Sequence, residues 1–379
     1  MSAATSRPSE ALARVDAELR ELRTSAPATR GQAARAYIRT MNLVVVAATP
    51  ERAAGWVPVV DEVLQSVPAR AIVVGLDPDG RDALEAGTTA ICTPGEQGAQ
   101  IVCSERVTLV ARGGVCARLP SCVAALCSSD VPTTLVWLGR VHAEDPVFEA
   151  LALDTSRIVL DAAQGSLGSL ASVVAWARGR REGERPGVAD LAWTRLATWH
   201  ELGARFFDEP RLRPLASAVT RVTLTQASPA GAPLGPEASL MLGWLSTRLD
   251  WKAASLAGKL RLVRNAQTQV HTTLRADPAA TAPRDALVGI SIEASAGELS
   301  MRGEIQRAPG ESDAATWRLE VTRGGDVQRI EQHVRLRPGQ PARLLERTLR
   351  RPTYDPALSD TATWVDQLRT DDLTVSSAT

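Results

Sequence analysis

The chain has 379 residues, 44% of them hydrophobic, and its 43 basic and 43 acidic residues balance to a formal net charge of zero. This size and composition are typical of a globular protein with two or three domains. The balanced charge gives no overall field that would favour nucleic acid or an anionic membrane, so neither is expected as a partner.

The first part of the chain is predicted to be an α/β domain. Apolar residues at spacings of three and four predict a helix over 9–23, and we assign 1–30 to this helix and a loose segment after it. Strands then alternate with helices over 31–180, which indicates a largely parallel sheet with helices on both faces. Pro58 predicts a kink or an early break in its helix. The expected strands are 42–48, 69–76, 88–93, 100–111, 133–139 and 157–162, of which 88–93 and 100–111 are edge-like, and the expected helices are 49–67, 120–129, 145–153 and 170–178.

The second part is predicted to be an α+β domain. The charged, glycine- and proline-containing stretch around 181–188 is expected to be the linker, and 189–379 the second domain. Its period-two alternation and short turns indicate an antiparallel meander with one solvated face. The expected strands are 259–264, 268–276, 286–294, 299–307, 316–323 and 328–337, and the expected helices are 189–208, 210–218, 236–250, 341–350 and 359–369.

The compartment is predicted from the N-terminus and the cysteines. The first residues lack the continuous apolar core of a signal peptide, and runs such as 43–48 are far too short to span a bilayer. A cytoplasmic protein is therefore expected. Its cysteines are odd in number, lack CxxC spacing, and favour buried free thiols in a reducing cytosol, with a redox switch between two of them as the alternative. They are Cys92, Cys103, Cys116, Cys122 and Cys127.

Motifs for catalysis are missing from the sequence. It contains no P-loop, no GxGxxG after a strand and no GxSxG, and its four histidines are scattered. Neither a metal nor a nucleotide cofactor is expected. In a parallel sheet, ligands bind beyond the C-terminal ends of strands, so polar residues there are the best small-molecule candidates. The alternative is that they solvate loops and cap helices, with Asp145 capping the helix that follows. These residues are Arg140, His142, Glu144 and Asp145 after strand 133–139, and Asp161 after strand 157–162.

The segment 190–208 is unusually rich in aromatic residues. On a helical wheel its apolar arc spans about 160° and includes Trp199, with Trp193 just beyond it. Arg195 falls inside this arc, where a buried guanidinium must pair, extend to solvent or lie at an interface. Trp and Arg are also enriched at protein–protein hot spots. The pattern therefore leaves two interpretations open, a core helix or a surface for a partner.

The same segment, DLAWTRLATWHELGARFFD, resembles the pattern D-L-x-W-T-R-L-x-x-W-R-E-L of OpcA, the glucose-6-phosphate dehydrogenase assembly protein family. The resemblance covers most of the chain and is weakest over the first 30 residues and the C-terminal strands. His200 stands where the family usually has Arg, and Ala192 where it often has Asn. Further blocks in the family's order are NLVVVA (42–47), ARAIVVGLDP (69–78), QIVCSERVTLVARGG (100–114), SDVPTTLVWLGRVHAEDPVFEAL (129–151), RIVLDA (157–162) and LMLGWLSTRLDWK (240–252).

The resemblance implies a non-catalytic cytosolic factor that binds glucose-6-phosphate dehydrogenase and favours its active oligomer, in support of the oxidative pentose phosphate pathway. We expect Trp193, Arg195, Trp199 and His200 to lie at or beside the contact. One alternative is a regulator or enzyme that binds a sugar phosphate among the strand-end residues. Another is a scaffold for a different enzyme.

Overall fold

The structure is a computed structural model that describes residues 8–24, 34–94, 100–256, 259–264, 268–311, 313–337, 339–368 and 373–377. Most of the loose segment expected before residue 31 lies outside the described residues. The chain divides into two compact units. The first is Met1–Leu191 with Gln340–Asp355, and the second is Ala192–Gly339 with Pro356–Thr379.

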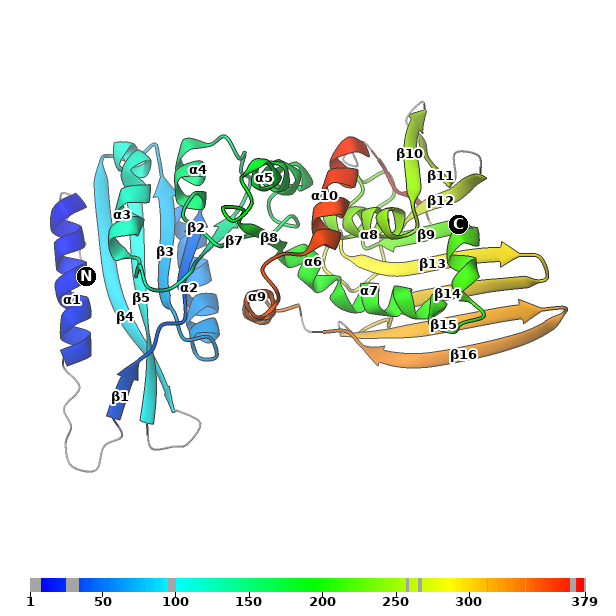
Figure 1. Ribbon diagram of the computed structural model, residues 1–379, viewed down its shortest axis with the longest axis horizontal. Helices are drawn as coiled ribbons and strands as arrows, with labels where there is room; N and C mark the ends of the chain where they lie inside the picture. The colour runs from blue at the N-terminus through cyan, green and yellow to red at the C-terminus, as the bar shows by residue number, and fades with distance from the viewer. Residues whose placement is uncertain are drawn as a thin grey trace. The chain divides into compact units, whose positions relative to one another are not determined.

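The first unit is built on an eight-stranded sheet in the order β1-β5-β3-β2-β6-β7-β8, with β4 paired to β5 (Figure 1). All neighbours are parallel except β4 and β5, which are antiparallel. The predicted parallel α/β sheet is confirmed. The strands are β1 (Ala34–Tyr37), β2 (Asn42–Ala47), β3 (Arg70–Asp77), β4 (Ala83–Pro94), β5 (Gln100–Arg112), β6 (Thr133–Leu138), β7 (Arg157–Leu160) and β8 (Gly187–Asp190).

Helices cover both faces of this sheet. On one face, α2 and α9 share a buried apolar cluster with alternate residues of β2, β3 and β6, such as Val45, Val73 and Val136. The intervening residues Val44 and Leu135 face the other side, where they line a cavity with α3 and α4. The helices of the unit are α1 (Pro8–Thr24), α2 (Pro50–Leu64), the 3₁₀ helix η1 (Gly113–Arg118), α3 (Leu119–Leu126), α4 (Pro146–Ala152), α5 (Leu167–Gly179) and α9 (Pro341–Arg350).

Helix α2 does not break at its internal proline, so of the two predicted effects of Pro58, a kink or an early break, the break is wrong. The helix begins after Thr49, whose side chain accepts a hydrogen bond from the Arg52 amide. It then runs through Pro58 to Leu64. Proline removes the amide that would bond to the Ala54 carbonyl, but both residues are exposed, so water can satisfy that carbonyl.

Two parts of the first sheet differ from the sequence-based expectation. β5 lies inside the sheet, not at its edge, because its polar residues have buried partners: the Ser104 hydroxyl bonds to the Leu64 carbonyl, and Glu105 is held in an ion pair. The expected linker 181–188 overlaps β8, which pairs with β7. A Cβ at Gly187 would lie 1.8 Å from the Thr353 carbonyl oxygen, so this strand requires glycine where the sequence suggested a linker. The division falls after Leu191.

The second unit is built on a nine-stranded sheet in the order β10-β11-β12-β9-β13-β14-β15-β16, with β17 paired to β12. It is antiparallel apart from the parallel pairs β9–β12 and β12–β17, which confirms the predicted α+β class. The strands are β9 (Val219–Gln226), β10 (Trp251–Leu256), β11 (Lys259–Arg264), β12 (Thr268–Ala276), β13 (Leu287–Ala296), β14 (Leu299–Arg307), β15 (Ala314–Arg323), β16 (Asp326–Arg335) and β17 (Ser376–Ser377).

Helices pack on one face of the second sheet and leave the other open. α7 contacts β14 and α8 contacts β9. Along β14, Met301, Gly303 and Ile305 are buried on the helix side, while Arg302 is exposed on the open side. The helices of the unit are α6 (Leu191–Arg195), α7 (Ala197–Ala204), α8 (Pro236–Arg248), α10 (Pro356–Leu368) and the 3₁₀ helices η2 (Arg205–Phe207) and η3 (Arg213–Ala218).

Candidate functional site

The aromatic segment predicted as one helix forms α6, α7 and η2 in close succession. The Leu196 amide donates to the Ala192 and Trp193 carbonyls, so the helical path continues between α6 and α7. Trp193 is 4% exposed and Trp199 is 2% exposed. These two indole rings therefore belong to the core of the second unit and do not form a surface on the described chain.

His200 lies between two tryptophans. Its ring centroid is 4.3 Å from that of Trp193 and 4.7 Å from that of Trp244 on α8. Both His200 and Trp244 are half-buried, so this aromatic group reaches the surface of the unit where Trp193 does not. Trp244 was not among the predicted contact residues, although it stands in the block 240–252 that carries the resemblance.

Arg195 is paired inside the second unit. Its Nη1 lies 2.9 Å from Glu237 Oε1, and the side chains of the two residues are 25% and 7% exposed. The other oxygen, Glu237 Oε2, accepts from the Leu287 amide at 3.0 Å. The buried carboxylate is thus satisfied by a guanidinium that remains partly open to solvent, as the position of Arg195 in the apolar arc requires. Nothing near residue 195 in the sequence indicates this partner.

Two of the strand-end residues, Asp145 and Asp161, bond to the backbone. The Asp145 side chain accepts from the Val147 and Phe148 amides and caps α4, as one interpretation of the sequence predicted. Asp161 is 2% exposed, and its side chain accepts from the Ala163 amide. Arg140 and His142 are exposed. The two carboxylates accept hydrogen bonds from backbone amides, as the capping interpretation expects, and a ligand site among the four residues stays a prediction.

A cavity of about 360 Å³ lies at the opposite end of the strands, between α3 and α4. Its walls combine apolar residues such as Val123 and Leu151 with polar ones such as Asp154. Cys127 also lines it, and burial raises the pKa of this thiol, which disfavours the reactive thiolate. Sequence reasoning did not predict this cavity, because its lining comes from the starts of strands and the ends of helices.

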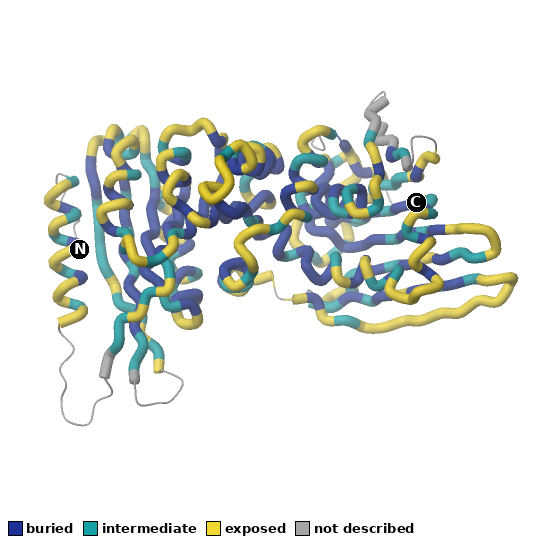
Figure 2. The backbone as a smooth tube through the Cα atoms, viewed as in Figure 1, coloured by how far each residue is buried: buried dark blue, intermediate teal, exposed yellow. Residues whose placement is uncertain are grey.

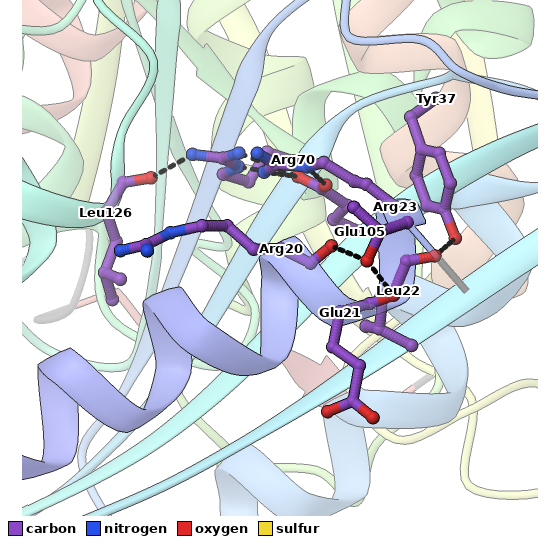
Figure 3. Close-up of polar contacts among 9 residues, drawn as sticks. Arg20, Glu21, Leu22, Arg23, Tyr37, Arg70, Glu105 and Leu126 are labelled. Atoms are coloured by element: carbon purple, nitrogen blue, oxygen red, sulfur yellow. Dashed lines mark hydrogen bonds and ion pairs between the residues drawn. The ribbon is translucent and has the colours of Figure 1, made fainter. Parts of the chain in front are cut away.

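A buried ion-pair cluster joins α1 to the first sheet (Figure 3). Arg23 Nε lies 2.5 Å from Glu105 Oε1, and Arg70 Nη2 lies 2.8 Å from Glu105 Oε2. Arg70 also donates to the Leu126 carbonyl at 2.8 Å. Burial alone would raise the pKa of Glu105, but the hydrogen bonds and charges of Arg23 and Arg70 outweigh burial and lower it. This cluster therefore stabilises the packing of α1 on the sheet, and its charged groups are paired with one another and not available for catalysis.

The expectation of free thiols is wrong for two of the cysteines. Cys92 on β4 and Cys103 on β5 stand opposite each other in the antiparallel register, with Cα atoms 4.1 Å apart, and form a disulfide. Motif spacing did not reveal this pair, because strand register and not sequence spacing brings the two residues together. Cys116, Cys122 and Cys127 are free, and burial raises the pKa of each thiol.

The described residues lack two further features. No group of three or more His, Cys, Asp or Glu side chains is placed to hold a metal ion. In the same part of the chain, no helix combines the length and apolarity needed to cross a bilayer.

Comparison with solved structures places the chain in a class of two-unit proteins with a parallel α/β sheet followed by a mostly antiparallel sheet. The fold is similar to that of glucose-6-phosphate 1-dehydrogenase from Mycobacterium avium, with a TM-score of 0.51, 12% identity, and coverage of 90% of this chain and 94% of that one. Sequence similarity assigns the chain to one family within this fold class. Residues 60–177 match the N-terminal domain, and residues 186–362 the C-terminal domain, of the family described as glucose-6-phosphate dehydrogenase subunit. The chain belongs to this family, the OpcA family.

Relatives named OxPP cycle protein OpcA support the assignment. The protein from Nostoc punctiforme is 28% identical over 203 residues, which cover 52% of this chain and 41% of the relative. The protein from Synechocystis is 23% identical over 308 residues, which cover 77% of this chain and 62% of the relative. The matches thus span between two fifths and about three fifths of these relatives.

Proposed function

We propose that the chain is a non-catalytic factor that binds glucose-6-phosphate dehydrogenase and favours its active oligomer, as part of the oxidative pentose phosphate pathway. The observation that carries this proposal is the match of both halves of the chain to domains of a glucose-6-phosphate dehydrogenase subunit. A partner that binds one oligomeric state more tightly shifts the enzyme toward that state by the difference in binding free energy. No chemistry on the part of this chain is needed for such an effect.

The contact is proposed to include Arg195 and His200, the members of the predicted quartet that remain partly exposed. Trp193 and Trp199 support the contact indirectly, because their buried rings fix the path of α6 and α7. Trp244 extends the surface, because its half-buried ring packs against His200. Arginine and tryptophan are among the residue types enriched at protein–protein hot spots.

The test is a titration of this chain into glucose-6-phosphate dehydrogenase from the same organism, with activity and light scattering followed together. A saturable rise in activity, with the appearance of a mixed oligomer, is the expected result. No binding and no activation, with both proteins folded, would refute the proposed function.

The contact is tested with His200→Ala and Arg195→Ala. Each is expected to weaken binding by about 1 kcal/mol or more. Arg195→Ala also leaves the buried Glu237 without its guanidinium, so near-ultraviolet circular dichroism must show that the variant is folded. The matched control is Arg284→Ala, which removes an arginine that is 80% exposed in the same unit and is expected to bind normally. Normal binding by folded His200→Ala and Arg195→Ala would place the contact elsewhere.

The sugar-phosphate alternative is separated by a thermal shift assay on the chain alone. Because the Asp145 and Asp161 side chains bond to backbone amides, we expect glucose 6-phosphate, 6-phosphogluconate and NADP to leave the melting temperature unchanged. A rise that Arg140→Ala abolishes would instead establish a ligand site at the strand ends.

A further inference from the structure

The open face of the second sheet carries an alternating row of charges. Strand register aligns Arg221, Glu293, Arg302, Glu320 and Arg329 side by side across β9, β13, β14, β15 and β16. Ion pairs link Arg221 to Glu293 at 3.2 Å and Arg329 to Glu320 at 2.7 Å. The row therefore alternates in sign across five strands and ends in a positive charge at β16.

A second charged row runs beside the first and ends at β16 in a charge of the opposite sign. Glu304, Arg318 and Glu331 are aligned across β14, β15 and β16, and Arg318 lies 2.8 Å from Glu331. This row ends in a negative charge. The outer strand thus presents Arg329 and Glu331 two residues apart, each pointing to the open face and each the last member of a charged row.

The outer edge of β16 is free in the part of the chain that the structure describes. β16 pairs only with β15, through a two-residue turn in which Gly324 and Gly325 have φ of 56° and 94° (Figure 1). In such a hairpin Asp326 is hydrogen-bonded to Arg323, and the bonded positions then alternate. The even-numbered residues of β16 therefore bond to β15, and the amides and carbonyls of the odd-numbered residues 327–335 point outward. Figure 2 shows the strand exposed along almost its whole length.

An apolar residue lies at the centre of this edge. Ile330 is 48% exposed, although it stands opposite buried Leu319 on the helix-covered face. A ten-residue edge strand without proline that exposes isoleucine is a template for pairing with another strand.

We propose that β16 pairs antiparallel with β16 of a second copy of this chain, about a two-fold axis at Ile330, so that the two sheets become one. In this register Arg329 of each copy faces Glu331 of the other, and the two Ile330 side chains meet. Each charged row continues across the junction with its sign alternation intact. A shift of the axis by one residue would set Glu331 against Glu331 or Arg329 against Arg329. Opposite charges directly across an antiparallel pair are stabilising and like charges are destabilising, so the sequence favours this register.

Charge exchange tests the pairing in the full chain. Arg329→Glu and Glu331→Arg each place two like-charge pairs at the junction, so each variant alone is expected to form the dimer with a dissociation constant about tenfold higher or more. A mixture of the two variants restores both opposite-charge pairs and is expected to give a heterodimer near wild-type affinity. Sedimentation equilibrium gives the three constants. Arg221→Glu, at the far end of the same row, is the matched control and should dimerise normally.

Crosslinking tests the register. Opposed residues at a non-hydrogen-bonded antiparallel position have Cα atoms about 4.5 Å apart, within reach of a disulfide. Ile330→Cys is therefore expected to form a covalent dimer on mild oxidation, above the wild-type background. Gln332→Cys would face Gln328 of the other copy and should not. A wild-type chain that stays monomeric at the highest attainable concentration overturns the proposal, and so does a dimer that is indifferent to both charge reversals.

Discussion

Among single residues, Glu105 shows how a buried charge is maintained in the first unit. Its side chain is 1% exposed and is held between Arg23 and Arg70. Because one carboxylate serves two guanidinium groups, its removal leaves two cations without their partner. We predict that Glu105→Gln lowers the free energy of unfolding at pH 7 by about 3–5 kcal/mol, as is typical when one member of a buried pair is removed. Urea denaturation measures the loss.

The stabilisation that Glu105 provides depends on pH, and the sign of this dependence follows from its pKa. The folded state lowers the pKa of Glu105, so its stabilisation is fully present above the ordinary carboxyl range and is lost as pH falls through the lowered value. The difference between wild type and Glu105→Gln should therefore shrink below about pH 4. The exposed Glu10→Gln is the control and should change stability little at any pH. A difference that stays constant down to acid pH would contradict an ionised Glu105.

Two glycines are expected to respond oppositely to the same substitution. A Cβ at Gly303 would lie 2.6 Å from two ring atoms of Phe206, which is fully buried and stacks on Trp317 at 5.4 Å. Gly303→Ala should therefore destabilise the protein by about 1–3 kcal/mol through overpacking. Gly55 is an exposed position inside α2 with no atom within 4 Å of its Cβ, so Gly55→Ala should stabilise by about 0.5–1 kcal/mol. Equal thermal shifts of one sign for both variants would refute this account.

Among the elements, those with an intact periodic pattern were predicted with accurate ends. The bounds of β11, β12, β14 and α9 match the sequence-based ranges. The four-residue strands β1 and β8 were missed because they are too short for periodicity and depend on pairing with a neighbour. β9 was missed for another reason. It is polar, and its fully buried Gln226 is satisfied by Ser228 and the Pro233 carbonyl, partners that the sequence does not reveal.

The disulfide between β4 and β5 can be tested by counting the free thiols of the protein. With Cys92 and Cys103 joined, thiol titration in denaturant without reductant is expected to find three thiols, and five after reduction. Loss of an eleven-residue crosslink in Cys92→Ala should lower stability by about 2–3 kcal/mol. Cys122→Ala is the control, since it removes a thiol outside the bond. Five thiols before reduction would show that the oxidised pair does not form under those conditions.

At the scale of the whole molecule, the sequence predicts the two fold classes but not the path of the chain between the units. It identified Arg195 as a residue that needs a partner, but Glu237 is 42 positions away and has no local signal. It also assigned 341–350 to the second domain, whereas α9 belongs to the first unit. An amphipathic pattern shows that a helix covers a core, and it does not show which core.

Helix α9 is held in the first unit by buried apolar contacts and hydrogen bonds. Leu344, Leu345 and Leu349 lie in the buried cluster with α2 and the central strands. Arg157 on β7 donates to the Thr348 and Leu349 carbonyls at 2.8 and 2.9 Å, and so caps the C-terminal end of the helix. Three buried leucines contribute about 5–9 kcal/mol, which is comparable to the whole stability of a typical domain.

The first unit is therefore expected to need residues from two separate parts of the chain. A fragment of residues 1–191 should unfold without a cooperative thermal transition, or at a much lower temperature than a fragment in which 340–355 is joined to it through a flexible glycine–serine linker. The joined fragment with Leu344→Asp and Leu345→Asp is the control, since it keeps the chain length and removes the apolar contacts. Circular dichroism and dye binding to exposed apolar surface measure the difference. If 1–191 alone melted as the joined fragment does, α9 would be an accessory of the first unit, and the core of that unit would be complete within the N-terminal half of the chain.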